Sequence, residues 1–167
     1  MEGKRIKDSS VVIAEMMIPQ DANPAGNVHG GVIMKHIDTA AAVVAFRHAR
    51  TNVVTASIDR LDFHNPVYIG DLLFFRASLN LVGRTSMEIG VKVEAENLRT
   101  GEVRHTASAY LTYVALDDSG RPHELAPLIL ETGEEARRNN EAKSRREIRL
   151  AEKKREAGCQ KEPDKCR

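Results

Sequence analysis

The chain has 167 residues, of which 41% are hydrophobic and 4% aromatic, and its formal net charge is +1. This length is typical of one domain, and the hydrophobic content is enough for a sizeable core. Residues 1–130 carry 13 Lys or Arg against 15 Asp or Glu, whereas residues 131–167 carry 12 against 9. A nucleic-acid binder is expected to have a basic, aromatic-bearing surface on its folded part. The composition therefore argues against nucleic acid as a partner.

The N-terminus reads Met1-Glu2-Gly3-Lys4-Arg5, and no apolar run is long enough for a signal peptide or a membrane-spanning helix. We therefore expect a cytoplasmic protein without a membrane partner. Both cysteines, Cys159 and Cys166, lie in the polar last stretch, where no packed element would position them. We expect them to be reduced, with neither a structural disulfide nor a metal site.

The first elements in chain order are a strand, a loop and a helix. Val11 to Ile18 is apolar and β-branched at its start, and Pro19 after it cannot donate to a strand ladder, so we predict a strand here. Residues 20–29 form a loop. The segment from Gly30 through His48 lacks proline and is apolar on nearly every face, which predicts a buried helix.

A period of two follows the helix and predicts four more strands. The alternation is clearest over residues 87–96, and turn signals separate these segments. One long helix and five strands are packed most economically when an antiparallel sheet curls around the helix. We therefore predict the α+β class. The four strands cover Val53–Phe63, Leu72–Val82, Met87–Ala95 and Val103–Leu116.

The chain changes character after Pro127. Residues 131–156 alternate acids and bases, with only Ile148 and Leu150 as large apolar side chains, so this segment cannot form a core. We expect one domain over residues 1–130 and a charged extension over residues 131–167. The extension is interpreted as a solvated helix or a partly disordered segment, and a helix docked on a neighbouring subunit is the alternative.

Asp38 is unusual because it interrupts an apolar stripe of the helix that contains Met34, Ala41 and Ala42. One interpretation is a surface ion pair with Lys35, three residues away. The other is a general base or nucleophile whose pKa is raised because the carboxylate is partly removed from water. The spacing alone leaves both open.

Gly30-Gly31 opens the helix and allows a substrate to approach free backbone N–H groups at the positive end of the helix dipole. These donors could stabilise negative charge that develops on a substrate carbonyl oxygen. The glycines could equally serve only a tight turn. The six histidines match no zinc-ligand spacing, and neither a G-x-S-x-G motif nor a P-loop is present, so we expect no metal and no cofactor.

The segment from Asp21 through the His29-Gly30-Gly31 turn to Asp38 closely resembles the hotdog-fold acyl-CoA thioesterases of the cytosolic acyl-CoA hydrolase type. The resemblance covers roughly residues 10–125 and includes the further segments Arg47-His48, Thr51–Ser57, Phe63–Pro66, Ile69–Asp71, Ser86–Ile89 and Ala109–Val114. It implies a hotdog fold in which the five-stranded sheet wraps around one central helix. It also implies hydrolysis of fatty acyl-CoA to a free fatty acid and coenzyme A.

The resemblance further implies a composite active site. In this family an Asn from the loop and an Asp from the helix act together, and they match Asn23 and Asp38 of this sequence. The two are contributed by different hotdog units, so the chain is expected to be a dimer at least, and a hexamer built as a trimer of dimers. Because this chain carries both residues, each dimer should contain two intact sites.

In the mechanism expected from these residues, Gly30 and Gly31 bind the thioester oxygen, Asp38 activates water or attacks directly, and Asn23 orients the water or the carbonyl. The phosphates or the nucleotide end of coenzyme A are expected near the Arg84-Thr85-Ser86 turn and Arg47. The pantetheine arm is expected beside Val54, Thr55, Ala56 and Ser57.

Two other functions are compatible with such a scaffold. A non-catalytic acyl-CoA-binding regulator would need a DNA-binding arm, which these 167 residues lack. A hydroxyacyl dehydratase relies on a histidine with a carboxylate, and His29 or His36 could supply that histidine. Thiol release from acyl-CoA, as opposed to hydration of an enoyl thioester, separates the hydrolase from the dehydratase.

Overall fold

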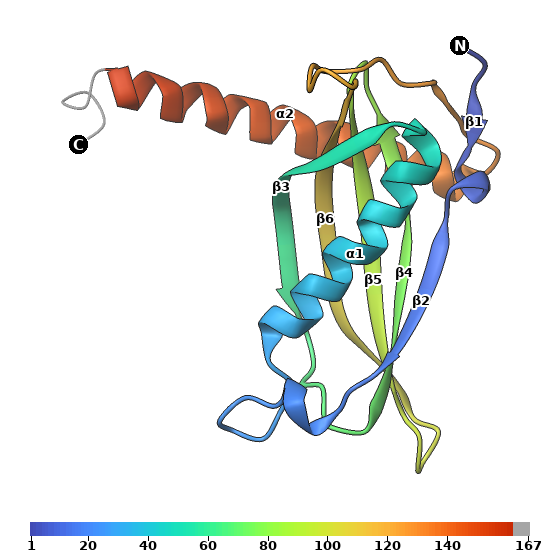
Figure 1. Ribbon diagram of the computed structural model, residues 1–167, viewed down its shortest axis with the longest axis vertical. Helices are drawn as coiled ribbons and strands as arrows, with labels where there is room; N and C mark the ends of the chain where they lie inside the picture. The colour runs from blue at the N-terminus through green and yellow to red at the C-terminus, as the bar shows by residue number, and fades with distance from the viewer. Residues whose placement is uncertain (162–167) are drawn as a thin grey trace. The chain divides into compact units, whose positions relative to one another are not determined.

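The computed structural model describes residues 1–161, with side chains through residue 158. It divides into two compact units, Met1–Leu130 and a second unit that begins at Glu131. The first unit contains a five-stranded antiparallel sheet with one long helix against one face (Figure 1). The strand order is β2-β4-β5-β6-β3, so β2 and β3 are the two edges.

The long elements agree closely with the expected ones, and the α+β class is confirmed. The structure also sets the sheet order, which no single segment of sequence encodes. The bounds are β2 Val11–Met16, α1 Gly30–Ala49, β3 Asn52–Phe63, β4 Asp71–Val82, β5 Ser86–Asn97 and β6 Val103–Leu116.

Alternation along the strands explains how the sheet packs on α1. Ile89 and Val93 of β5 are fully buried and share one core with Ile37 and Val44 of α1. Burying one such side chain contributes about 1.5–3 kcal/mol relative to leaving it in water. Glu94 comes between buried residues of β5 and projects from the opposite face of the sheet. Apolar side chains that recur about every 3.6 residues in the helix therefore pack in one layer against those that recur every second residue in the strands.

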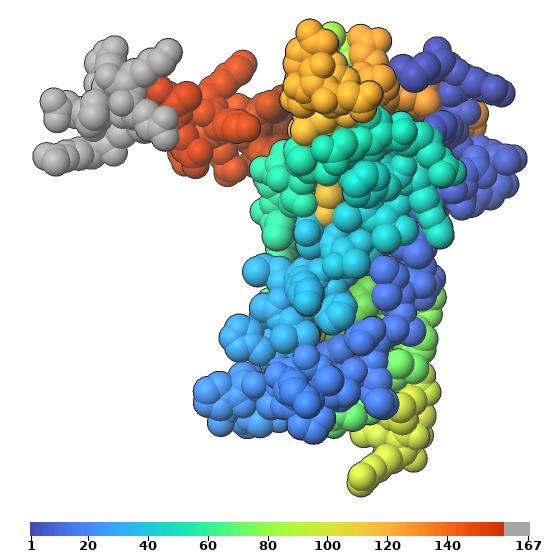
Figure 2. All heavy atoms as spheres, in the orientation of Figure 1, coloured from blue at the N-terminus to red at the C-terminus, as the bar shows by residue number. Residues whose placement is uncertain are grey.

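The outer side of α1 is open in the single chain. Met34 and Phe46 are 38% and 48% exposed, and atoms of α1 form much of the face seen in Figure 2. The expected burial of the helix is therefore only partial in one chain, because the sheet covers one side of it. Exposed apolar surface of this kind is typical of a protein interface.

Four short elements were not expected from the sequence. They are β1 (Lys4–Arg5), β7 (Leu128–Ile129) and the 3-10 helices η1 (Ile6–Asp8) and η2 (Pro19–Asp21). Strands β1 and β7 pair in parallel, so the two ends of the first unit lie side by side. Two- and three-residue elements contain too few side chains to show a period.

The second unit is helix α2, Gly133–Lys161. Its N-terminus is a capping box: Thr132 Oγ1 accepts from the Glu135 N–H at 3.2 Å, and the Glu135 carboxylate accepts from the Thr132 N–H at 3.1 Å. Arg137 forms ion pairs with Glu134 and Glu141 on the same face. The charged segment is thus helical from Gly133 to Lys161.

Within residues 1–161, no helix is both long and apolar enough to cross a membrane. The side chain of Cys159 and all of Cys166 lie outside the described residues. The expectation that both cysteines are reduced therefore stays a prediction.

Candidate active site

Asp38 lies in the third turn of α1, where its side chain is half-buried. Two hydroxyl groups donate to the same carboxylate oxygen: Thr55 Oγ1 lies 2.8 Å and Tyr113 Oη 2.6 Å from Asp38 Oδ1. Thr55 belongs to the edge strand β3 and Tyr113 to its neighbour β6. Among the described residues the partners of Asp38 are these hydroxyls and not Lys35, so the ion-pair interpretation lacks support.

Tyr113 is a member of this cluster that the sequence pattern did not single out. Its side chain is 1% exposed, and its hydroxyl also lies 2.9 Å from the Asp38 carbonyl oxygen. Burial raises the pKa of the Tyr113 phenol, and the hydrogen bond to Asp38 raises it further. The phenol therefore stays protonated and stays a donor. A tyrosine at a core-facing strand position is the only signal in the sequence, since a buried hydroxyl needs a partner.

Asn23 lies in the loop before α1, and its side chain organises that loop. Asn23 Oδ1 accepts from the backbone N–H of Ala25 at 2.9 Å and of Asn27 at 3.2 Å. Because the oxygen is used by two backbone donors, the amide nitrogen is the end left for a ligand. Gly26 follows with φ of +84°, a left-handed conformation that favours glycine at this turn.

The N-terminus of α1 is capped by His29, whose Nδ1 accepts from the Gly31 N–H at 2.9 Å. A methyl group at Gly31 would lie 3.0 Å from that nitrogen, so the glycine leaves room for the cap. Neither Gly30 nor Gly31 has a positive φ, and no described residue accepts from the Gly30 N–H. In the single chain, Gly30 thus offers a free donor, whereas the donor of Gly31 is used by His29.

A cavity of about 330 Å³ lies at this end of α1. Asn23 and Gly30 both contribute to its wall, while Asp38 does not. The helix rises about 1.5 Å per residue, which puts Asp38 about 12 Å farther along the axis than Gly30. One chain therefore brings Asn23 and Gly30 together but not Asp38. The remaining lining residues are Asn27, Val28, Ile33, Phe63, His64, Asn65, Pro66 and Val67.

The residues expected to bind coenzyme A lie in three places. Val54 to Ser57 lie on β3, where the pairing with β6 shifts register between Thr55 and Ser57. Arg84, Thr85 and Ser86 join β4 to β5, and the Arg84 side chain is 82% exposed. Arg47, near the end of α1, donates to the Ser10 carbonyl at 2.9 Å. Of all these residues, only Thr55 contacts Asp38 in the described part of the chain.

The two histidines considered for a dehydratase have structural contacts. The His29 imidazole caps α1, as described above, and the His36 ring lies 5.4 Å from the Phe75 ring, centre to centre. Among the described residues neither ring contacts a carboxylate, which a dehydratase pair requires.

A family model described as the thioesterase superfamily matches residues 25–102. The chain is also 39% identical over 144 residues to an uncharacterized acyl-CoA thioester hydrolase of Bacillus subtilis (strain 168), a match that covers 86% of this chain and 84% of that protein. The chain belongs to the thioesterase superfamily.

Solved structures of acyl-CoA thioesterases agree with this thioesterase over nearly its whole length. A hexameric acyl-CoA thioesterase, solved without ligand, is 37% identical with a TM-score of 0.88, and the match covers 91% of this chain and 97% of that one. The acyl-CoA hydrolase of Staphylococcus aureus, solved with butyryl coenzyme A and coenzyme A, is 33% identical with a TM-score of 0.87, covering 95% and 96%. That hydrolase has also been solved with alanine in place of an aspartate, an asparagine or a threonine.

The expected family is therefore confirmed, and this thioesterase is an acyl-CoA thioester hydrolase with the hotdog fold. Its enzyme class follows from relatives that match in both sequence and structure. Which residues perform the hydrolysis is a separate question, because the chain alone does not bring Asn23 and Asp38 together.

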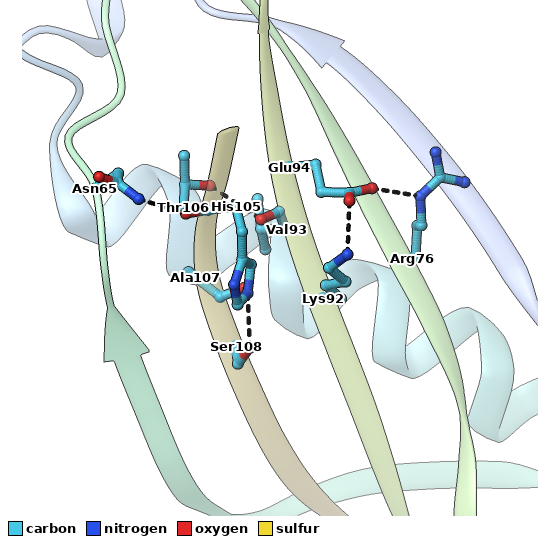
Figure 3. Close-up of polar contacts among 9 residues, drawn as sticks. All are labelled: Asn65, Arg76, Lys92, Val93, Glu94, His105, Thr106, Ala107 and Ser108. Carbon is cyan, nitrogen blue, oxygen red and sulfur yellow. Dashed lines mark hydrogen bonds and ion pairs between the residues drawn. The ribbon is translucent and has the colours of Figure 1, made fainter. Parts of the chain in front are cut away.

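The face of the thioesterase sheet opposite α1 carries separate polar contacts (Figure 3). Glu94 accepts from Arg76 at 2.7 Å and from Lys92 at 2.6 Å, and the hydrogen bonds from Lys92 and then Arg76 lower the pKa of Glu94. His105 Nε2 lies 2.9 Å from Ser108 Oγ. These contacts lie on the surface of β4, β5 and β6, so we assign them to the sheet and not to the Asp38 cluster.

Proposed function

We propose that this thioesterase hydrolyses fatty acyl-CoA at a composite site formed by Asn23 of one chain and Asp38 of a second. The observation that carries the proposal is their separation: Asn23 and Gly30 line one cavity, whereas Asp38 lies two turns along α1, between β3 and β6. A second copy of the chain is the simplest source of the Asp38 that the cavity at Asn23 lacks, and of the Asn23 that the Asp38 cluster lacks.

The edge strand β3 is the surface on which we place the second copy. Thr55, the partner of Asp38, lies on this strand, and Val54 and Ile58 are 42% and 41% exposed. An unpaired edge with exposed β-branched side chains is a template for another chain. A two-fold interface would put both Asp38 clusters beside the partner and create two equivalent sites. We propose further that three such dimers assemble into a hexamer.

The spacing of residues in a relative supports the assignment. In the Staphylococcus aureus hydrolase, the asparagine replaced by alanine precedes the replaced aspartate by 15 positions, and the replaced threonine follows that aspartate by 17. Asn23, Asp38 and Thr55 have the same spacing in this chain. The three residue types chosen for study in that enzyme thus coincide with the three that we propose.

The reaction would proceed as follows. The thioester oxygen accepts hydrogen bonds from the Gly30 N–H and the Asn23 amide, and the Gly31 N–H joins them if the His29 imidazole yields it. Asp38 removes a proton from the water that attacks the carbonyl carbon, or attacks that carbon itself before water releases the acyl group. The C–S bond breaks, the coenzyme A thiolate takes up a proton, and a fatty acid leaves.

The remaining binding assignments also belong to this proposal. Arg47 and the Arg84–Ser86 turn would meet the phosphates or nucleotide end of coenzyme A, and Val54 to Ser57 would lie beside its pantetheine arm. The Arg84 side chain is 82% exposed, and the exposed Arg47 side chain is bonded to the Ser10 carbonyl oxygen, which leaves both cations available to a ligand. The cytoplasmic location stays a prediction that cell fractionation tests.

Complementation between two inactive variants tests the composite site. Asn23→Ala and Asp38→Ala, each carrying a different tag, are co-expressed and purified through both tags, and thiol release is measured with acyl-CoA of several chain lengths. Each variant alone should be inactive. A mixed dimer should regain about half of the wild-type activity, because one of its two sites keeps both residues.

Glu102→Ala serves as the control, because it removes an exposed carboxylate from the turn between β5 and β6 and should leave thiol release unchanged. Doubly tagged assemblies that stay inactive would overturn the composite site. Full activity of Asp38→Ala alone would overturn the role of that carboxylate.

A further inference from the structure

The two donors at Asp38 converge on one of its two oxygens. Thr55 Oγ1 and Tyr113 Oη both contact Oδ1, at 2.8 and 2.6 Å. No described residue donates to Oδ2. The two oxygens of this carboxylate are therefore not equivalent, and only Oδ2 is left to meet water or the thioester.

Tyr113 is the more deeply buried of the two donors. Its side chain is 1% exposed on the core-facing side of β6, whereas Thr55 lies on the exposed edge strand. The phenol has a single hydrogen. It is donated to Asp38 Oδ1, the closer acceptor, in preference to the Asp38 carbonyl oxygen at 2.9 Å. The raised pKa of the phenol keeps that hydrogen in place. A buried, permanent donor of this kind limits rotation of the carboxylate.

We propose that Tyr113 is a positioning residue that, together with Thr55, holds Asp38 Oδ1 so that Oδ2 is the reacting oxygen. This inference rests on the proposed catalytic role of Asp38. Two hydroxyl donors on Oδ1 leave Oδ2 of the carboxylate open to water or the thioester, as a base or nucleophile requires. They also hold it in one rotamer, so no reorganisation is needed when substrate arrives.

Tyr113→Phe tests the proposal, because it removes one oxygen and keeps the buried ring. We expect kcat for acyl-CoA hydrolysis to fall about tenfold or more, as expected when a reacting group loses its fixed orientation, while KM changes little. Urea unfolding should show a folded variant, so that the loss lies in kcat of the folded enzyme. A merely structural hydroxyl would, when removed, lower the free energy of unfolding and leave kcat of the folded enzyme unchanged.

Tyr110→Phe is the matched control, since Tyr110 lies on the same strand but is not among the core residues that pack on α1. It should leave both kcat and KM unchanged. Thr55→Val should lower kcat as Tyr113→Phe does, and Thr55→Ser, which keeps a hydroxyl, should restore the wild-type kcat. The Thr55 pair also decides the question if Tyr113→Phe does not fold.

The possible outcomes distinguish the positioning role of Tyr113 from the proposed catalytic role of Asp38. If Asp38→Ala is inactive and Tyr113→Phe keeps the wild-type kcat, the positioning role is overturned and the proposed site stands. If Asp38→Ala hydrolyses acyl-CoA normally, the proposed site itself fails. If Tyr113→Phe loses activity only because it unfolds more easily, and Thr55→Val keeps the wild-type kcat, the positioning role is also overturned.

Discussion

Single polar residues that the sheet buries are expected to have the largest individual effects on stability. Asp71, at the start of β4, is 3% exposed and accepts from Arg104 at 2.8 Å and from the Tyr68 N–H at 3.0 Å. The Arg104 guanidinium also lies over the Tyr68 ring, 5.3 Å from its centre. These contacts join the turn before β4 to the start of β6, across one end of the sheet.

Replacing Asp71 by Asn should therefore destabilise the fold strongly. The change leaves the Arg104 cation with a neutral partner in a mostly buried place, and breaking a buried pair in this way costs about 3 kcal/mol. Urea unfolding at fixed protein concentration measures the effect. Asp62→Asn removes one partner of the exposed Arg60–Asp62 pair and should change the midpoint little. Equal midpoints for the two variants would contradict the importance of burial at Asp71.

Residue by residue, the sequence identified Asp38 because a carboxylate in an apolar helical stripe is unusual. It did not identify Tyr113, because nothing near position 113 in the sequence shows that its hydroxyl reaches a helix 75 residues away. The single-chain geometry also changed the status of Gly31, whose N–H is used by His29. That local contact could have been foreseen, since a histidine directly before a helix is able to cap it.

Among the elements, α1 depends on both of its ends for its place on the sheet. At its N-terminus His29 provides the cap, and at its C-terminus Arg50 adopts a left-handed conformation with φ of +56°. His48, 1% exposed, lies close to that end, and its Nε2 lies 2.9 Å from the Ala126 carbonyl oxygen. This contact ties the helix to the segment before β7. A carbonyl oxygen can only accept a hydrogen bond, so Nε2 must carry the hydrogen.

His48 should make stability depend on pH. Burial lowers its pKa, with a smaller contribution from Lys4, and the Ala126 contact opposes the change. The unfolded chain therefore binds a proton that the folded chain does not, and stability falls as the pH drops below about 6.5 toward the folded pKa, by at most about 1.4 kcal/mol per pH unit.

Urea unfolding of the wild type and His48→Gln at pH 7.5 and pH 5.5 tests this prediction. The glutamine keeps an N–H donor for Ala126 but does not titrate, so the difference between the two pH values should shrink. His123→Gln, at an exposed histidine, should keep the wild-type difference. An undiminished pH dependence in His48→Gln would assign the effect to other groups.

At the scale of the whole molecule, one chain leaves two kinds of surface uncovered. The outer side of α1 exposes Met34 and Phe46, and the edge strand β3 exposes Val54 and Ile58. The solved hexameric thioesterase to which this chain is similar shows that related chains assemble. Assembly would explain why a helix that is apolar nearly all round is covered on only one side here.

A charge on the β3 edge should prevent assembly and with it hydrolysis. Ile58→Lys puts an ammonium group where we propose that the second copy pairs, and lysine on an edge strand opposes strand addition. Light scattering should show a smaller species, and thiol release should be lost with it. Val103→Lys changes a similarly exposed side chain at the start of β6 and should keep both assembly and activity. A fully assembled and active Ile58→Lys would place the dimer contact elsewhere.

The sequence by itself determined the helix, the five strands, the α+β class and the family. These follow from short-range properties, namely the period of apolar residues, the turn signals and the local motif around His29-Gly30-Gly31. The tertiary structure alone decided that β2 and β3 are the sheet edges, that Thr55 and Tyr113 share one oxygen of Asp38, and that Asn23 and Asp38 of one chain stay apart. Each of these depends on pairing between distant strands and on the fixed rise of a helix, which bring together or separate residues irrespective of their spacing in the sequence.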